Sequence, residues 1–238
     1  MNKFIKTIVP ICAVALLGSG GYLIGKDIYR SGQNSVEVVI QGDDNEELIN
    51  SLNLRISKML TILDKTVTDV SAEDLEGIST ISKEMFYSCT KLTSAELPQG
   101  ISEIGIKAFY GCSALEKISI PGSVTAIKDT AFYNCYKLTE VLISEGLTTI
   151  GYESFANCTK LESIILPSTI KNITSRAFYG CKTLTELKLL SSTPPTLSST
   201  DALPTSITTI YIPQGTLEVY SSANNWSLLS DKFVELEE

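Results

Sequence analysis

The chain has 238 residues, a formal net charge of −8 and no histidine. It is long enough to bury a sizeable core, but it lacks the commonest general base and the commonest metal ligand. We find no paired catalytic motif and no glycine-rich phosphate loop, so the sequence indicates a protein that is not an enzyme and uses no cofactor or metal. The negative charge and the absence of a basic patch argue against nucleic-acid binding.

Residues 1–30 contain an uncharged run from Thr7 to Gly25, preceded by Lys3 and Lys6. Its length is close to the ~20 residues that span a bilayer as a helix. The segment is therefore either a signal peptide, with small residues at 18–20 near a cleavage site, or an N-terminal membrane anchor through residues 7–25. Both alternatives predict a hydrophobic helix. Because the basic residues keep the N-terminus in the cytoplasm, we expect the rest at the cell surface, anchored by the N-terminus, or secreted if the segment is cleaved.

Residues 31–77 combine an acidic linker with an amphipathic helix. The acidic run at 43–47 lacks the spacing of an EF-hand loop and indicates solvated charge. Across 45–65, five apolar residues recur at spacings of three and four, as a and d positions do: Ile49, Leu52, Ile56, Met59 and Leu63. The helix either forms a homo-oligomeric stalk or lies over the first repeat as an N-terminal cap. Only about two heptads are present, which leaves both alternatives open.

A repeat of constant length fills residues 78–213. Three residue types recur every 23 positions: Phe86, Phe109, Phe132, Phe155 and Phe178; Cys89, Cys112, Cys135, Cys158 and Cys181; Leu92, Leu115, Leu138, Leu161 and Leu184. A fixed period of this size predicts a solenoid. Within one copy, Ile118 and Ile120 alternate as strand residues do, and Pro121-Gly122 ends the strand. We expect the segment with Phe and Cys to form a short helical or 3₁₀ turn.

The run Ala-Phe-Tyr-x-Cys-x-x-Leu-x-x-Ile-x-Ile-Pro at 108–121 and its copies resemble the bacterial leucine-rich repeats called BspA-like, or Treponema pallidum type. The resemblance covers roughly 78–213. It implies a mainly β fold with short helical turns, a right-handed leucine-rich-repeat solenoid of about six coils. Members of this family are often found on bacterial surfaces, some are implicated in adhesion to host proteins, and similar repeats occur in protozoan and gut-phage proteins. The resemblance implies binding and names no ligand.

Five of the six cysteines share one phase of the repeat. They are expected to stack as a column that points into the core, with parallel Cβ vectors that disfavour bridges between neighbouring coils. A buried free cysteine behaves as a small apolar residue. We therefore expect a reduced ladder of core thiols, with disulfides or reactive thiols as the alternative.

The repeat changes at its C-terminal end. Ile207, Ile210 and Ile212 are in phase with the repeat and predict a sixth strand, while the loop 191–204 replaces the Phe and Cys of that coil. Residues 214–238 are expected to form a C-terminal cap. Trp226 is interpreted as a core residue of this cap rather than as a ligand anchor.

Two columns of outward residues follow from the strand alternation. One runs Ser94, Lys117, Glu140, Ser163, Glu186, and the other runs Glu96, Ser119, Leu142, Ile165, Lys188. Leu142 and Ile165 are neighbours on a face expected to be wet, which can mark an interaction site; alternatively they only favour strand formation. The candidate partner-binding residues are Lys117, Glu140, Leu142, Ser163, Ile165, Glu186 and Lys188. A row of tyrosines at 87, 110, 133 and 179 is either a second contact surface or packing between coils.

These observations favour an exported or cell-surface interaction module, adhesin-like and not enzymatic. Such a module would bind a protein or glycan through one face of the repeats. The alternative is a structural component of a virion or surface appendage, in which the helix at 49–63 forms an oligomeric stalk.

Overall fold

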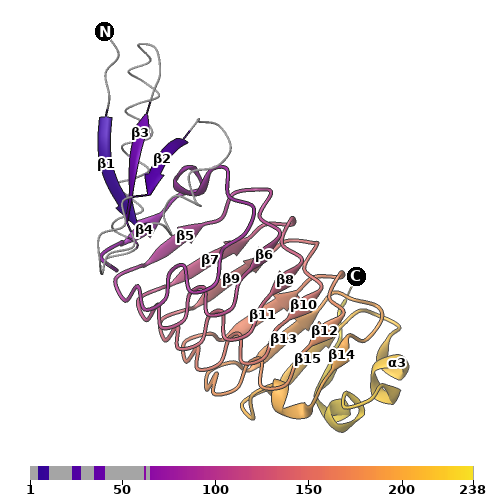
Figure 1. Ribbon diagram of the computed structural model, residues 1–238. Coiled ribbons are helices and arrows are strands. Elements are labelled where there is room, and N and C mark those ends of the chain that lie inside the picture. The colour runs from indigo at the N-terminus through magenta and orange to yellow at the C-terminus, as the bar shows by residue number, and fades with distance from the viewer. Residues whose placement is uncertain (1–4, 11–22, 28–34, 41–61, 63–64, 238) are drawn as a thin grey trace.

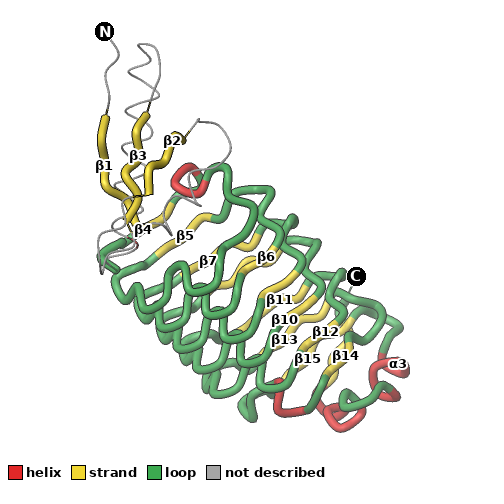
Figure 2. Tube along the Cα trace, in the orientation of Figure 1, coloured by secondary structure: helices red, strands yellow, loops and turns green. Residues whose placement is uncertain are grey.

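The computed structural model describes residues 5–10, 23–27, 35–40, 62 and 65–237. From β4 onward the chain winds into coils that stack one on the next, with α3 beside the last coil (Figure 1). Strands and turns make up almost all of this stack, and helices are confined to short pieces (Figure 2). The fold is therefore mainly β.

Each repeat contributes one strand to each of two parallel arrays. We call the first array the long-strand sheet: β4 (Asp69–Val70), β5 (Ser94–Glu96), β7 (Lys117–Ile120), β9 (Glu140–Ile143), β11 (Ser163–Leu166), β13 (Glu186–Leu189), β15 (Thr209–Ile212) and β16 (Phe233–Glu235). The second array holds β6 (Glu103–Ile104), β8 (Ala126–Ile127), β10 (Thr149–Ile150), β12 (Asn172–Ile173) and β14 (Thr196–Leu197). Ile118 lies opposite Val141, one repeat later, so equal positions of successive coils stack.

Tight turns, rather than helices, carry the repeat Phe and Cys. Within one turn the N–H of Cys112 donates to the carbonyl of Phe109, and that of Leu115 donates to Cys112, both at 3.1 Å. These are bonds of the 3₁₀ type that do not extend into a helix. Asn134 and Asn157 both have φ of 63°, a left-handed conformation that Asn adopts more readily than most residues.

The core is a set of columns along the stack. The five repeat phenylalanines are fully buried, and successive rings stack with centroids 4.8 to 5.4 Å apart. The repeat cysteines are free and buried, as a ladder of core thiols requires. The Cys112 thiol donates to the carbonyl of Phe86 at 3.0 Å, so each thiol proton finds an acceptor one coil earlier. Burial raises the pKa of Cys89 to about 11 and that of Cys135 well above its usual value.

Both ends of the stack are covered. At the first coil Val67, Val70 and Leu75 are buried, the last in the 3₁₀ helix η1 (Glu73–Leu75). The last coil carries the 3₁₀ helix η2 (Thr200–Ala202), and α3 (Leu217–Ser222) and the 3₁₀ helix η3 (Ser227–Lys232) follow it. Trp226 is 1% exposed and donates from Nε1 to the carbonyl of Pro195 at 2.7 Å. Trp226 is thus a core residue of the cap, as expected.

The N-terminal segment differs from the expectation. Residues 7–25 were expected to form a hydrophobic helix, yet β1 (Ile5–Pro10) and β2 (Leu23–Asp27) are strands. Both pair antiparallel with β3 (Ser35–Ile40), which lies in the expected linker. β1 and β3 are rich in β-branched residues, which favour strands. Pairing with β3, which is distant in the sequence, stabilises β1 and β2 as strands although the apolar run also suits a helix. No helix within the described part of the chain is long and apolar enough to cross a membrane.

The remaining N-terminal predictions lie outside the described residues. They concern the centre of the apolar run at 11–22 and the oligomerisation positions Ile49, Leu52, Ile56, Met59 and Leu63. Ile62 is described: it is 3% exposed, and its carbonyl accepts from the Cys89 thiol at 3.6 Å. This residue therefore packs on the first repeat.

Candidate functional site

The seven candidate binding residues lie together on the outward side of the long-strand sheet, which we call the strand face. They come from four successive long strands: Lys117 of β7, Glu140 and Leu142 of β9, Ser163 and Ile165 of β11, and Glu186 and Lys188 of β13. The register places Lys117 beside Glu140, Ser163 beside Glu186 and Ile165 beside Lys188. The register thus joins members of the two predicted columns into rows across β7 and β9, and again across β11 and β13.

An apolar stripe runs along one of these rows. Leu142 is 56% exposed and Ile165 is 49% exposed. Beyond Lys188 the row continues through half-buried Tyr211 to Val234, which is 45% exposed. Sequence reasoning missed Tyr211 and Val234, although each follows the previous member of the row by 23 residues. The strand at 233–235 is hard to recognise from the sequence, because Glu235 occupies the last inward position of β16, where the other repeats have an apolar residue.

Charged residues flank the apolar stripe. Lys117 Nζ and Glu140 Oε2 are 3.2 Å apart, and both side chains are well exposed. Such a surface pair contributes about 0–1 kcal/mol to the stability of the fold, so its main effect is on which partner surfaces can bind beside the stripe. Glu186 adds a further negative charge to the flanking row on β13, while Lys188 places one positive charge within the row of the stripe itself.

The backbone ladder is interrupted beneath Leu142 and Ile165. At the start of β5, β7, β9, β13 and β15 an N–H donates to the preceding coil, as Thr139 does to Glu116 at 2.9 Å and Thr185 to Glu162 at 3.0 Å. Among the described residues, no backbone hydrogen bond joins β9 to β11, and Glu162 does not donate to Thr139. The strand face thus consists of two four-stranded sheets that meet at an open seam between β9 and β11.

The tyrosine row divides into two parts. Tyr87, Tyr110 and Tyr133 stack with centroids 5.1 and 4.9 Å apart, and burial raises the pKa of Tyr110. For these three, packing between coils is the correct alternative. Tyr179 is separated from them by Ala156, which is fully buried, and is itself 49% exposed.

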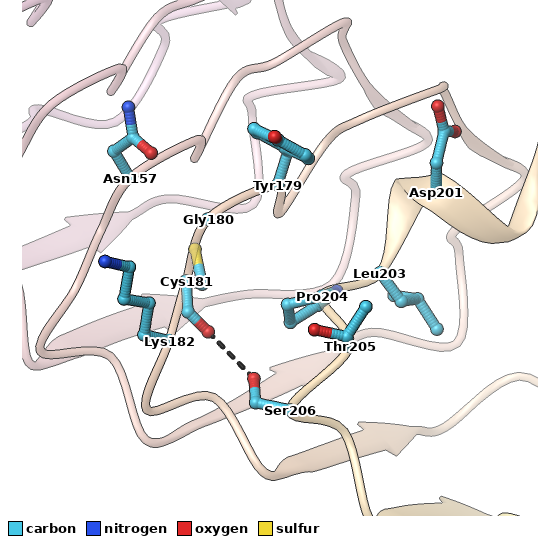
Figure 3. A pocket seen from close by; sticks show the side chains of 10 residues that line it. All are labelled: Asn157, Tyr179, Gly180, Cys181, Lys182, Asp201, Leu203, Pro204, Thr205 and Ser206. Atoms are coloured by element: carbon cyan, nitrogen blue, oxygen red, sulfur yellow. Dashed lines mark hydrogen bonds between the residues drawn. The ribbon is translucent and has the colours of Figure 1, made fainter.

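Tyr179 borders a cavity of about 600 Å³ at the turn of the last coil (Figure 3). Its walls come from the turn that follows Phe178 and from the turn that follows η2. We call this cavity the notch; its lining residues are Asn157, Tyr179, Gly180, Cys181, Lys182, Asp201, Leu203, Pro204, Thr205 and Ser206. No cluster of three or more potential metal ligands occurs in the described part of the chain.

Comparisons with known proteins agree with this geometry. Residues 79–200 match the model of the BspA type leucine rich repeat region in 6 copies. No curated protein matches the chain.

Several solved structures are similar. The pneumococcal vaccine antigen PcpA is 19% identical, with a TM-score of 0.60, and the match covers 72% of this chain and 42% of that chain. A Treponema pallidum leucine-rich repeat protein is 22% identical over 67% of this chain and 79% of its own, with a TM-score of 0.47. A Bacteroides ovatus leucine-rich repeat protein is 22% identical over 73% of this chain and 55% of its own, with a TM-score of 0.43. The likeness to PcpA shows the fold, and the family match, which spans half of the sequence, shows that the chain belongs to the BspA-type leucine-rich repeat proteins.

Proposed function

We propose that this protein is a non-enzymatic, surface-exposed interaction module that binds a protein partner through its strand face, as an adhesin does. The observation that carries the proposal is the apolar stripe of Leu142, Ile165, Tyr211 and Val234 on the outward side of a sheet. In this proposal the coils form a right-handed solenoid, the hand that crossovers between parallel strands almost always take.

The stripe supplies a modest but sufficient driving force. Full burial of a Leu or Ile side chain is worth about 1.5–3 kcal/mol. Because Leu142 and Ile165 are each about half exposed, a partner that covers both gains about 2 kcal/mol, or roughly thirtyfold in affinity. The backbone beneath them is already ordered by the stacked core, so little conformational entropy is lost on binding.

The flanking charges supply selectivity. The pair of Lys117 and Glu140 lies beside the stripe rather than in it, as the polar rim of an interface does. Glu186 continues this rim on β13, while Lys188 lies in the row of the stripe, between Ile165 and Tyr211. Charges at a rim change the association rate and the choice of partner more than the affinity.

A double substitution tests the proposal. The full chain carrying Leu142→Glu and Ile165→Glu is compared with the unaltered protein for binding to a panel of purified extracellular host proteins. Leu228→Glu is the matched control, because Leu228 is 71% exposed and lies in η3, outside β9 and β11. We expect the double variant to lose at least thirtyfold in affinity for any bound partner and the control to bind normally.

Two results contradict the proposal. Undiminished binding by a double variant with an unchanged circular dichroism spectrum shows that the strand face is not the site. Protease treatment of intact source cells tests exposure: failure to release repeat peptides, while known surface proteins are cleaved, contradicts the surface role.

A further inference from the structure

The notch arises because the last coil has a shorter turn than the others. The turn 177–184 has eight residues, and its equivalent 202–207 has six. One end is held in place because the N–H of Phe178 donates to Ala202 at 2.8 Å, as that of Phe155 does to Ala177 at 2.9 Å. The other end is held by the pairing of Leu187 with Ile210. The missing residues leave the cavity over the turn of the preceding coil (Figure 3).

The shortening leaves a backbone donor without an acceptor. In the earlier coils, the N–H of the residue two positions after the repeat Phe donates to a backbone carbonyl of the next coil. Asn134 donates in this way to Ala156 at 2.9 Å, and Asn157 to Tyr179 at 2.8 Å. The next residue in this column is Gly180, and its N–H has no hydrogen-bond partner among the described residues. The earlier donors of the column all point to the following coil, so we infer that this N–H points into the notch. An amide in that position needs a ligand atom or water as its acceptor.

Tyr179 contributes an aromatic surface to the same cavity. Its ring lies at the border of the notch (Figure 3) and is half exposed. The Arg176 guanidinium lies over the ring at 4.2 Å and forms an ion pair with Glu153 at 2.8 Å. A hydrogen bond to the Tyr152 hydroxyl raises the pKa of Arg176. Arg176 is thus held in place, and it holds the tyrosine ring in a defined orientation.

Opposite charges lie on opposite walls. Lys182 comes from the same turn as Gly180, while Asp201 belongs to η2 of the last coil and accepts from the Ser175 hydroxyl at 3.0 Å (Figure 3). Between them, buried Leu203 and Pro204 form an apolar wall. The notch therefore offers an anion-binding side, a hydroxyl-accepting side and an apolar surface.

We propose that the notch binds a hexuronate residue of an acidic glycan. The apolar side of the sugar ring packs on Tyr179, and its carboxylate accepts from Lys182 and from the N–H of Gly180 as charge-assisted hydrogen bonds. The sugar hydroxyls donate to Asp201. A multiply charged group such as a phosphate would be repelled by that carboxylate, so one carboxylate per sugar residue, among hydroxyls, fits better. The site lies at the turns, away from the strand face, and is independent of the function proposed above.

Titration of the full ¹⁵N-labelled chain with tetragalacturonate and with a hyaluronan tetrasaccharide tests this assignment. The fully methyl-esterified tetragalacturonate is the neutral probe. We expect at least one acid to bind at least tenfold more tightly than the ester. We also expect it to move the Gly180 amide proton downfield, because that proton gains a charged acceptor.

Matched variants assign the roles of the side chains. Tyr179→Ala is expected to weaken binding at least tenfold, whereas Tyr136→Ala, at a tyrosine that is 44% exposed and outside the notch, leaves it unchanged. Lys182→Gln is expected to weaken binding about tenfold and to flatten its dependence on salt. Lys137→Gln is the control for Lys182→Gln, since Lys137 is also exposed and does not line the notch.

Three outcomes overturn the assignment: neither acid moves the Gly180 amide; the ester binds as tightly as the acid; or Tyr179→Ala binds normally. Loss of binding in Lys182→Gln alone would indicate a simple carboxylate site and would also refute a sugar site. The variant with Leu142→Glu and Ile165→Glu should bind uronate normally, so failure here and failure of the strand-face proposal can be told apart.

Discussion

The phenylalanine column permits a quantitative test of how one coil stabilises the next. Phe132 stacks on Phe109 at 5.1 Å and on Phe155 at 5.0 Å, whereas within the described part of the chain Phe178 stacks only on Phe155, at 5.4 Å. Each such pair is worth about 0.5–1.5 kcal/mol beyond the area that it buries. Substitution of Phe by Leu keeps most of the apolar volume. Apart from the lost ring stacking, it therefore lowers the free energy of unfolding by usually less than about 1.5 kcal/mol. We expect Phe132→Leu to destabilise by about 2–3 kcal/mol and Phe178→Leu by about 1–2 kcal/mol.

A double-mutant cycle isolates the stacking contribution. Phe132→Leu combined with Phe155→Leu should show a coupling of about 0.5–1.5 kcal/mol, because these rings touch. Phe132→Leu combined with Phe178→Leu should be additive, since Phe155 separates the two rings. Urea unfolding of the full chain, followed by circular dichroism and by fluorescence of the single tryptophan, Trp226, measures each free energy. Coincidence of the two signals checks that unfolding is cooperative.

Two results would refute this reasoning. If the adjacent and the separated pairs couple equally, direct contact between the rings is not the source of the stabilisation. If Phe178→Leu costs as much as Phe132→Leu, the number of stacked neighbours does not set the cost.

The buried thiols and the open seam lead to two further predictions. Burial holds the pKa of Cys135 well above the ordinary 9.0. The contribution of this buried thiol to the free energy of unfolding is therefore complete below pH 9. Above that pH the thiol of the unfolded chain ionises, and the contribution falls by up to about 1.4 kcal/mol per pH unit. Urea unfolding at pH 8, 9 and 10 should show a shallower decline for Cys135→Ala, and an unchanged slope contradicts the pKa argument. At the seam, the amide of Glu162 should exchange with solvent at least about tenfold faster than that of Thr185, which donates to the Glu162 carbonyl at 3.0 Å. Equal protection of the two amides by NMR would mean that β9 and β11 are paired in solution.

Much of the strand face could be predicted because the repeat does not slip. A constant spacing places Leu142 beside Ile165, and strand alternation sends both side chains outward. The same reasoning placed the phenylalanines and the thiols in the core, where the structure has them. It failed at β1 and β2, since an apolar run has the composition of both a helix and a strand until its partner β3 is known.

The sequence by itself determined the period, the inward columns and the outward columns, because each depends only on the spacing between residues of one repeat. Only the tertiary structure decided how successive coils meet. The missing ladder between β9 and β11 and the unpaired N–H of Gly180 are properties of two coils together. A hydrogen bond between coils requires both partners at the right distance and angle, and the path of the second coil is set by its own turns. Among the described residues, the regular pairing between coils fails at the seam, under the most exposed part of the apolar stripe, and at the notch beside Tyr179.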